Sequence, residues 1–177
     1  MQQITHTMKQ LLALTLIALL GSASLFAQHN KMGSEKRASP HDTVMSGNVT
    51  ITYGRPYKKG RDIFGGLVPY DQVWRTGADE ATQVTFKKNA NFGGKPIKAG
   101  TYTLFTIPGK SEWTIILNSK LGQWGAFSYD QVKSQDVLKT TVPANHSIAP
   151  VEQFTILLPD GQLMMQWDQT TVMVPVK

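Results

Sequence analysis

Apolar residues that alternate with polar ones are the feature of this sequence that most narrows the folds open to it. Val49, Ile51 and Tyr53 alternate with threonines. Because successive side chains of a strand point to opposite faces of a sheet, a period of two predicts a strand with one buried face. The pattern recurs, and it predicts further strands over residues 83–87, 101–107, 113–118, 137–142, 154–158, 163–167 and 171–176.

Helical signals are scarce in the same region. Outside the N-terminal segment, no window longer than a turn or two keeps the period of an amphipathic helix. Residues 119–135 interrupt the strand pattern, so we expect a large loop or a short helix there. Many short strands joined by Gly and Pro turns, such as PDGQ at 159–162, are typical of antiparallel folds. We therefore predict a mainly β chain that forms a single antiparallel β-sandwich of jelly-roll or immunoglobulin-like type, with little helix outside the N-terminal signal.

The N-terminus has the pattern of a secretory signal peptide. Lys9 precedes the apolar run LLALTLIALL and the small-residue segment GSASLFA. This order predicts a cleaved signal over residues 1–27. The apolar run is shorter than the roughly 20 residues of a membrane-spanning helix, so we expect no transmembrane segment after cleavage. The sequence has no Cys, hence no lipid-attachment cysteine and no disulfide, and we expect the mature chain in the periplasm or outside a bacterial cell.

The remaining sequence divides into an arm and a domain. Residues 28–46 are polar and nearly free of large apolar side chains, which predicts a flexible polar arm. Residues 47–177 carry the strand pattern and are expected to form the β-sandwich domain. The formal net charge of the whole chain, +6, favours anionic partners in general. Most positive charges are scattered, so nucleic acid is not expected as a partner.

Motifs for cofactors and catalysis do not stand out. The four His residues are dispersed without metal-ligand spacing, so we predict no metal site. Residues 109–111, GKS, match the end of a phosphate-binding loop, but a strand follows them, so we interpret them as a turn. The sequence contains no G-x-S-x-G nucleophile motif. We therefore expect no cofactor, and the sequence does not favour an enzyme.

The segment RPYKKGR, residues 55–61, is a basic cluster with two Arg and two Lys where a strand ends. Arg55 and Arg61 suit bidentate contact with phosphate or carboxylate, so one hypothesis is an anion site. The alternative is a solvated turn whose charges keep a sheet edge from pairing with other chains.

Three tryptophans fall into two groups. Trp113 and Trp167 are in phase with the apolar side of their strands, and we expect both in the core. Trp124 lies between two glycines in the 119–135 stretch, where no strand pattern buries it. Either its ring stacks on the sugar rings of a ligand, or it packs the loop down as a small satellite core.

The block PYDQVWRTGADEAT, residues 69–82, combines aromatic residues with one Arg and an acidic pair. One interpretation is a buried ionic latch, in which Arg75 pairs with Asp79 or Glu80. The other is a pocket wall in which Trp74 stacks on a ligand while Arg75 and Glu80 bind its polar groups. Glu80 is also the candidate for a general acid or base, which would need a second carboxylate about 5 to 9 Å away. Possible partners are Glu112, Asp130, Glu152 and Asp168, and the sequence selects none of them.

A recognisable set of segments comprises GRPYKKGRDIFGGLVPYDQVWRTGADEATQVTF, AGTYTLFTIPG, EWTIILN and WDQTTVMVPV. This set resembles one known family, the domain-of-unknown-function family twenty-nine eleven of secreted or envelope proteins of bacteria. It runs over nearly all of residues 39–177, and VPYDQVWRTGADEAT is a specific block within it. The resemblance implies a β-rich secreted domain and supplies no catalytic residues, because the family has no established activity.

For function we favour a non-catalytic binding or interaction module of the bacterial envelope, whose ligand is a glycan or an anionic envelope component. The alternatives are a carboxylate-dependent hydrolase of envelope glycans that uses Glu80, and a structural partner of another envelope protein. The sequence leaves the oligomeric state open. The candidate ligand-binding residues are Arg55, Arg61, Trp74, Arg75, Glu80 and Trp124.

Overall fold

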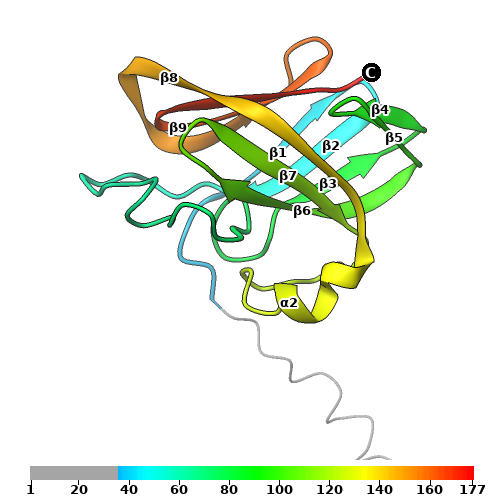
Figure 1. Cartoon of the computed structure of the whole chain (residues 1–177), viewed down its shortest axis with the longest axis horizontal. Helices are drawn as coiled ribbons and strands as arrows, with labels where there is room; N and C mark the ends of the chain where they lie inside the picture. The colour runs from blue at the N-terminus through cyan, green and yellow to red at the C-terminus, as the bar shows by residue number, and fades with distance from the viewer. Residues whose placement is uncertain (1–35) are drawn as a thin grey trace, which may run out of the picture. The chain divides into compact units, whose positions relative to one another are not determined.

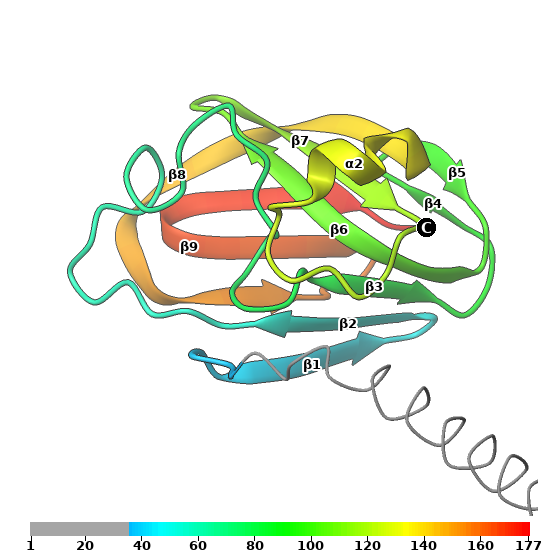
Figure 2. The same ribbon diagram turned by 90° about the horizontal axis from the view of Figure 1, so that it is seen from below.

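The computed structural model describes residues 36–177, so the predicted signal peptide and residues 28–35 of the predicted arm lie outside it. Seven strands form one antiparallel sheet in the order β1-β2-β3-β6-β7-β8-β9 (Figures 1 and 2). Their bounds are β1 His41–Ser46, β2 Val49–Gly54, β3 Gln83–Phe86, β6 Gly100–Pro108, β7 Glu112–Asn118, β8 Asp136–Leu157 and β9 Gln162–Pro175. A separate two-stranded sheet contains β4 Ala90–Phe92 and β5 Lys95–Ile97, and the helical elements are α2 Tyr129–Val132 and the 3-10 turn Lys133–Gln135. The described chain is therefore mainly β and antiparallel with little helix, as predicted.

The period-two segments form the strands predicted from them. In β2, Val49, Ile51 and Tyr53 are buried, while the threonines between them are partly or fully exposed. Ile51 lies opposite Val84 of β3, so the buried faces of the two strands coincide. Residues 119–135 contain the predicted loop and short helix.

Strand β8 makes the sheet curl. Its first part, from Asp136 to Pro143, pairs with β7, and its second part pairs with β9 through two register shifts. The second part also reaches the chain beyond β2, where Lys58 N donates to Glu152 O at 2.7 Å. Figure 2 shows β8 curving round one side of the domain from β7 towards β2. The result is a half-barrel made of one curled sheet, and a jelly-roll or immunoglobulin-like sandwich is not confirmed.

The difference from the expected sandwich comes from long bent strands. The sequence predicts two separate strands over residues 137–142 and 154–158, because the residues between them lack apolar alternation. In the structure most of these intervening residues are exposed. Both segments belong to β8, which stays extended through its bulges. The segments 163–167 and 171–176 likewise fall almost wholly within β9. Bulged strands bend and twist, so one sheet can fold over its own core.

Aromatic side chains fill the interior of the half-barrel. Trp113 and Trp167 are 2% and 1% exposed, which confirms their prediction as core residues. Trp74 is 8% exposed, and its ring lies nearly parallel to that of Trp167, with centroids 6.0 Å apart. Phe64 and Phe154 pack edge-on against the Trp74 ring, at 6.0 and 5.1 Å. Most of the Trp74 ring is therefore buried in the hydrophobic core.

The flexible arm predicted over residues 28–46 is wrong for its last part. His41–Ser46 form β1, which pairs with β2 over its full length, and Arg37–Lys177 form one compact unit. Strand β1 lies at the edge of the sheet and contains no buried residue. Its sequence therefore lacks the apolar alternation that identifies the other strands. The domain begins before residue 47.

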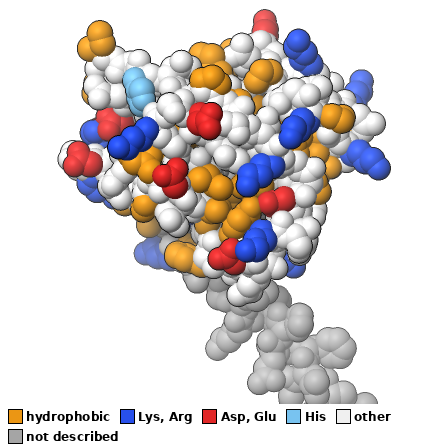
Figure 3. Space-filling model, in the orientation of Figure 1, with side chains coloured by type: hydrophobic (Ala, Val, Ile, Leu, Met, Phe, Trp, Pro, Cys, Tyr) orange, Lys and Arg blue, Asp and Glu red, His pale blue; other side chains and the backbone are white. Residues whose placement is uncertain are grey.

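The surface carries charges of both signs. On the face drawn in Figure 3, Lys and Arg side chains are interspersed with Asp and Glu, and apolar side chains lie between them. Within residues 36–177, none of the helices has the length and apolar character needed to cross a membrane.

Candidate functional site

The segment 74–82 leaves the sheet and returns to it beside β6. Backbone hydrogen bonds to β6 hold both of its ends, at Trp74 and at Thr82. Between them, Thr76 and Asp79 have φ angles of +57° and +62°. Left-handed backbone is uncommon outside glycine, and for a β-branched residue it is strained by about 1 to 3 kcal/mol. Because such strain is concentrated at functional sites, this segment is the first candidate for one.

Two glycines let the segment 74–82 lie directly on the end of β2. A Cβ atom on Gly54 would be 2.2 Å from Ala78 O, and a Cβ atom on Gly77 would be 2.8 Å from Gly54 O. Real Cβ atoms do not approach oxygen this closely, so any larger residue at Gly54 or Gly77 would push the two backbones apart. Close packing therefore explains why the block 69–82 has a glycine at position 77.

Asp79 binds the chain that precedes β1. Its carboxylate accepts from Ala38 N at 3.1 Å and from Ser39 N at 3.0 Å. His41 Nε2 lies 3.4 Å from Asp79 Oδ2. Burial alone would raise the pKa of Asp79, but the two amides and the His41 ring together hold this pKa below its ordinary value. Asp79 is therefore an anion that fixes residues 38–39 beside the strained segment.

Glu80 binds the same N-terminal chain. Both of its carboxylate oxygens accept from Arg37 Nε, at 2.8 and 3.0 Å, and His41 Nε2 lies 3.3 Å from Oε2. The Glu80 side chain is 35% exposed. Among the residues that the structure describes, no group of three or more His, Cys, Asp or Glu is arranged to hold a metal ion.

Arg75 pairs with neither acid. No ion pair within residues 36–177 includes Arg75, and its Nε is buried without a hydrogen-bond partner there. Burial lowers the pKa of Arg75, and the nearby Asp79 carboxylate opposes this shift. The latch predicted between Arg75 and Asp79 or Glu80 is not formed, because the two acids hold the N-terminal chain instead.

Arg75 lines a pocket with a volume of about 260 Å³. We call it the arginine pocket. Its charged side chains are Arg61, Arg75 and Asp79, its apolar wall contains Pro56, Leu67, Val68, Trp74 and Trp167, and Ala38 and Ser39 also line it. The pocket thus combines two guanidinium groups, one carboxylate and an apolar surface.

Arg61 is the residue of the basic cluster 55–61 whose charge reaches this pocket. Its Nε donates to Lys58 O at 3.0 Å, and its Nη2 donates to Tyr57 O, which fixes the side chain against its own turn. Arg61 remains exposed. Lys58 instead pairs with Asp168 at 2.6 Å. Within the basic cluster, Arg61 therefore lines the pocket, whereas Lys58 forms an ion pair elsewhere on the surface.

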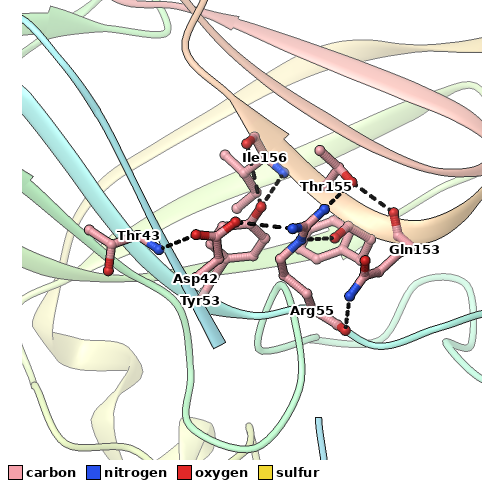
Figure 4. Close-up of polar contacts among 8 residues, drawn as sticks. Asp42, Thr43, Tyr53, Arg55, Gln153, Thr155 and Ile156 are labelled. Atoms are coloured by element: carbon pink, nitrogen blue, oxygen red, sulfur yellow. Dashed lines mark hydrogen bonds and ion pairs between the residues drawn. The ribbon is translucent and has the colours of Figure 1, made fainter. Parts of the chain in front are cut away.

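Arg55 stabilises the fold (Figure 4). Its Nη1 donates to Asp42 Oδ2 at 3.1 Å, on β1. Its Nη2 donates to Thr155 Oγ1 at 3.1 Å and its Nε to Phe154 O at 3.3 Å, both on β8. All three nitrogens have a partner, and Arg55 does not line the arginine pocket. Of the predicted ligand-binding residues, Arg55 is the one that the contacts assign most clearly to structure.

The Trp124 loop packs against the segment 74–82. Trp124 is half-buried and forms a backbone bridge with Glu80, and Gly125 N donates to Asp79 O at 3.0 Å. These backbone contacts fix the loop beside the segment 74–82, but the Trp124 ring belongs to neither hydrophobic cluster of the described residues. Phe127, which the sequence analysis did not single out, is the more open aromatic residue of this loop, at 82% exposure.

The structure therefore brings three of the predicted site residues together at one pocket, namely Arg61, Trp74 and Arg75. Sequence reasoning missed the contribution of Ala38 and Ser39. Both act on Asp79 through backbone amides, which every residue except proline has, so no side-chain pattern could reveal them.

Together, fold and site define a class of protein: a mainly β domain with one curled antiparallel sheet and an arginine-lined pocket. A family model described as a protein of unknown function, DUF2911, matches residues 35–176. The chain belongs to this family, which confirms the resemblance seen in the sequence. Comparison with curated proteins gives no significant match, and comparison with solved structures gives none either.

Proposed function

We propose that this protein is a non-catalytic binding module of the bacterial envelope that holds an anionic ligand in the arginine pocket. The observation that carries the proposal is the buried, unpartnered Nε of Arg75. A buried donor without an acceptor costs about 1 to 3 kcal/mol, and a charged donor costs more. A ligand that brings an acceptor to Arg75 recovers this free energy. The envelope location follows from the predicted signal peptide and is part of the proposal.

The charges around the pocket also support an anionic ligand. Arg61 is exposed and lines the same pocket, so it can attract an anion from solvent. Asp79 carries the opposite charge, but its oxygens already accept from two backbone amides and it does not pair with Arg75. The Arg75 charge is therefore left for a partner from outside the described chain.

The glycan part of our prediction narrows to acidic sugars. Stacking on a neutral sugar needs an exposed aromatic face. The aromatic residues that line the arginine pocket, Trp74 and Trp167, are almost fully buried, and the exposed Phe127 does not line it. An acidic sugar could still reach Arg75 through its carboxylate.

The contacts of Glu80 argue against the hydrolase alternative. A general acid or base must reach a proton of the substrate. Both Glu80 oxygens are engaged by Arg37, and His41 lies beside one of them. Glu80 therefore fits better as an anchor for the N-terminal chain.

Isothermal titration calorimetry of the purified protein tests the proposal, with acetate, hexanoate, phosphate, sulfate and glucuronate as probes. We expect at least one of these anions to bind, and Arg75→Ala to weaken its binding about tenfold or more, because a charge-assisted contact is lost. The control is Lys88→Ala, which removes one exposed charge outside the pocket and should leave binding unchanged. If no probe binds, or if Arg75→Ala binds as tightly as wild type, the proposal fails. Co-purification with another protein in the absence of anion binding would favour the structural-partner alternative.

A further inference from the structure

We infer that the arginine pocket selects a monocarboxylate that carries an apolar group, in preference to phosphate or sulfate. The inference rests on the proposed function, because it names the ligand class of the same pocket. It follows from the unpaired donor, the balance of charge among the lining residues and the apolar residues that line the same pocket.

The unpaired donor of Arg75 matches a flat acceptor. The Nε and one Nη of an arginine form an edge with two parallel N–H groups, which fits the two oxygens of a carboxylate. In Arg75 the Nε of this edge is buried and has no partner among residues 36–177. A carboxylate that reaches this edge would supply the acceptor that Arg75 Nε lacks.

The charges of the pocket balance a single negative charge. Arg61 and Arg75 are positive, and Asp79 is negative, so the walls carry one excess positive charge. Asp79 is held in its charged form by the Ala38 and Ser39 amides. A monoanion therefore neutralises the pocket, whereas a dianion such as sulfate would add a second negative charge close to Asp79.

Part of the pocket lining is apolar. Leu67 lines the pocket and is 46% exposed, while Val68, Trp74 and Trp167 also line it but are at most 8% exposed. Covering apolar surface of this kind is favourable in proportion to its area. With a volume of about 260 Å³, the pocket can hold a small molecule, and Arg75 and Leu67 both line it. Acetate carries only a methyl group and would cover little of this apolar surface.

Calorimetry with a matched set of probes tests the inference. 3-Phenylpropionate and hexanoate represent aromatic and aliphatic acids, acetate lacks the apolar group, sulfate is a dianion, and 3-phenylpropanol lacks the charge. We expect at least one of the two apolar acids to bind about tenfold or more tightly than acetate, sulfate and the alcohol, since several buried CH₂ groups are worth well over a factor of ten. The tighter of the two acids shows whether the pocket prefers an aromatic or an aliphatic group on the carboxylate.

Two variants separate the two halves of the inference. Arg75→Lys keeps the positive charge but loses the fork, and it should weaken the apolar acids about tenfold while the melting temperature stays close to that of wild type. Leu67→Ala should weaken the apolar acids and leave acetate unchanged; because Leu67 is largely exposed, the variant should fold. Lys88→Ala is again the control for loss of one charge.

The outcomes distinguish this inference from the proposed function. Sulfate or phosphate binding as tightly as the apolar acids would overturn the inference and leave an anion-binding module. Equal binding of 3-phenylpropanol and 3-phenylpropionate would overturn both, because the Arg75 charge would then play no part. Full retention of acid binding in Arg75→Lys would overturn the role of the fork.

Discussion

Arg55 and Arg75 are both half-buried, yet their surroundings differ. Arg55 has a partner for each of its three nitrogens, on β1 and β8. The Nε of Arg75 is buried and has no partner in the described chain, and Arg75 is one of the residues that line the arginine pocket. Contacts within the fold satisfy all three side-chain nitrogens of Arg55, whereas they leave the Nε of Arg75 without a partner. Burial therefore does not tell these two arginines apart, whereas an account of their hydrogen bonds does.

The largest effect on stability is expected for Arg55→Ala. This change removes three hydrogen bonds, one of them to Asp42, and leaves Phe154 O without its donor from Arg55. Hydrogen bonds to charged groups contribute about 1.5 to 3 kcal/mol, so we expect the free energy of unfolding to fall by about 2 to 3 kcal/mol. For a domain of this size the melting temperature should fall by roughly 5 to 12 °C.

Differential scanning calorimetry of wild type, Arg55→Ala and the surface control Lys88→Ala measures this loss. If Arg55→Ala melts within a degree or two of the control, the contacts in Figure 4 are not what joins β1 and β8, and the contrast with Arg75 loses one side.

A smaller effect is expected at Asp79, whose carboxylate fastens the N-terminal chain beside the pocket. Asp79→Asn should lower the free energy of unfolding by about 1 to 2 kcal/mol near neutral pH, because charge-assisted bonds from Ala38 N and Ser39 N become neutral ones. Folding lowers the pKa of Asp79. Its contribution is therefore complete above the ordinary carboxyl pKa of about 3.9 and is lost as the pH falls through the lower value of the folded state.

Urea denaturation at about pH 7 and about pH 3 checks the sign of this dependence. Wild type should lose more stability on acidification than Asp79→Asn does, so the two curves should converge at low pH. Asp160→Asn, in an exposed turn, is the matched control. A difference between wild type and Asp79→Asn that stays constant with pH would show that the Asp79 charge does not hold the N-terminal chain.

Most strands of the sheet were predictable from the sequence, whereas β1 and the bend of β8 were not. Strands β2 and β3 bury mostly alternate residues, and the period of two identifies them. Strands β6 and β7 each bury a run of four consecutive residues, and their density of β-branched and aromatic residues identifies them. Strand β1 buries none of its residues, and β8 bends through exposed ones, so neither carries a continuous pattern. How far one sheet curls depends on bulges and on pairing between distant segments, which a local pattern does not record.

The site was predictable as a segment but not as a set of contacts. The block 69–82 stands out by composition, and Trp74 and Arg75 within it do line a pocket. The partners of its acids lie more than 35 residues away, as the separations of 43 for Arg37 with Glu80 and 41 for Ala38 with Asp79 show. Because Ala38 contributes only a backbone amide, composition gives no sign of it, and the nearest cation in sequence, Arg75, looked like the natural partner.

The smallest effect on stability, and the sharpest test of the comparison, is expected for Arg75→Met. Methionine keeps the apolar length of the side chain but removes the charge. Within residues 36–177, Arg75 forms no ion pair and its Nε forms no hydrogen bond. The substitution therefore removes neither kind of contact. Replacing a buried charge by an apolar group of similar size is often neutral or stabilising, so the free energy of unfolding should change by about 1 kcal/mol or less, or rise.

Thermal melting of Arg75→Met beside Arg55→Met makes the comparison with one kind of substitution at both positions. A loss at position 75 as large as that at position 55 would mean that Arg75 is also held by the fold, and the argument for a ligand would lose its main support. A stable Arg75→Met that no longer binds anions would mean that the folded chain keeps a half-buried charge that its own stability does not require. The partner that satisfies such a charge must then come from outside the domain.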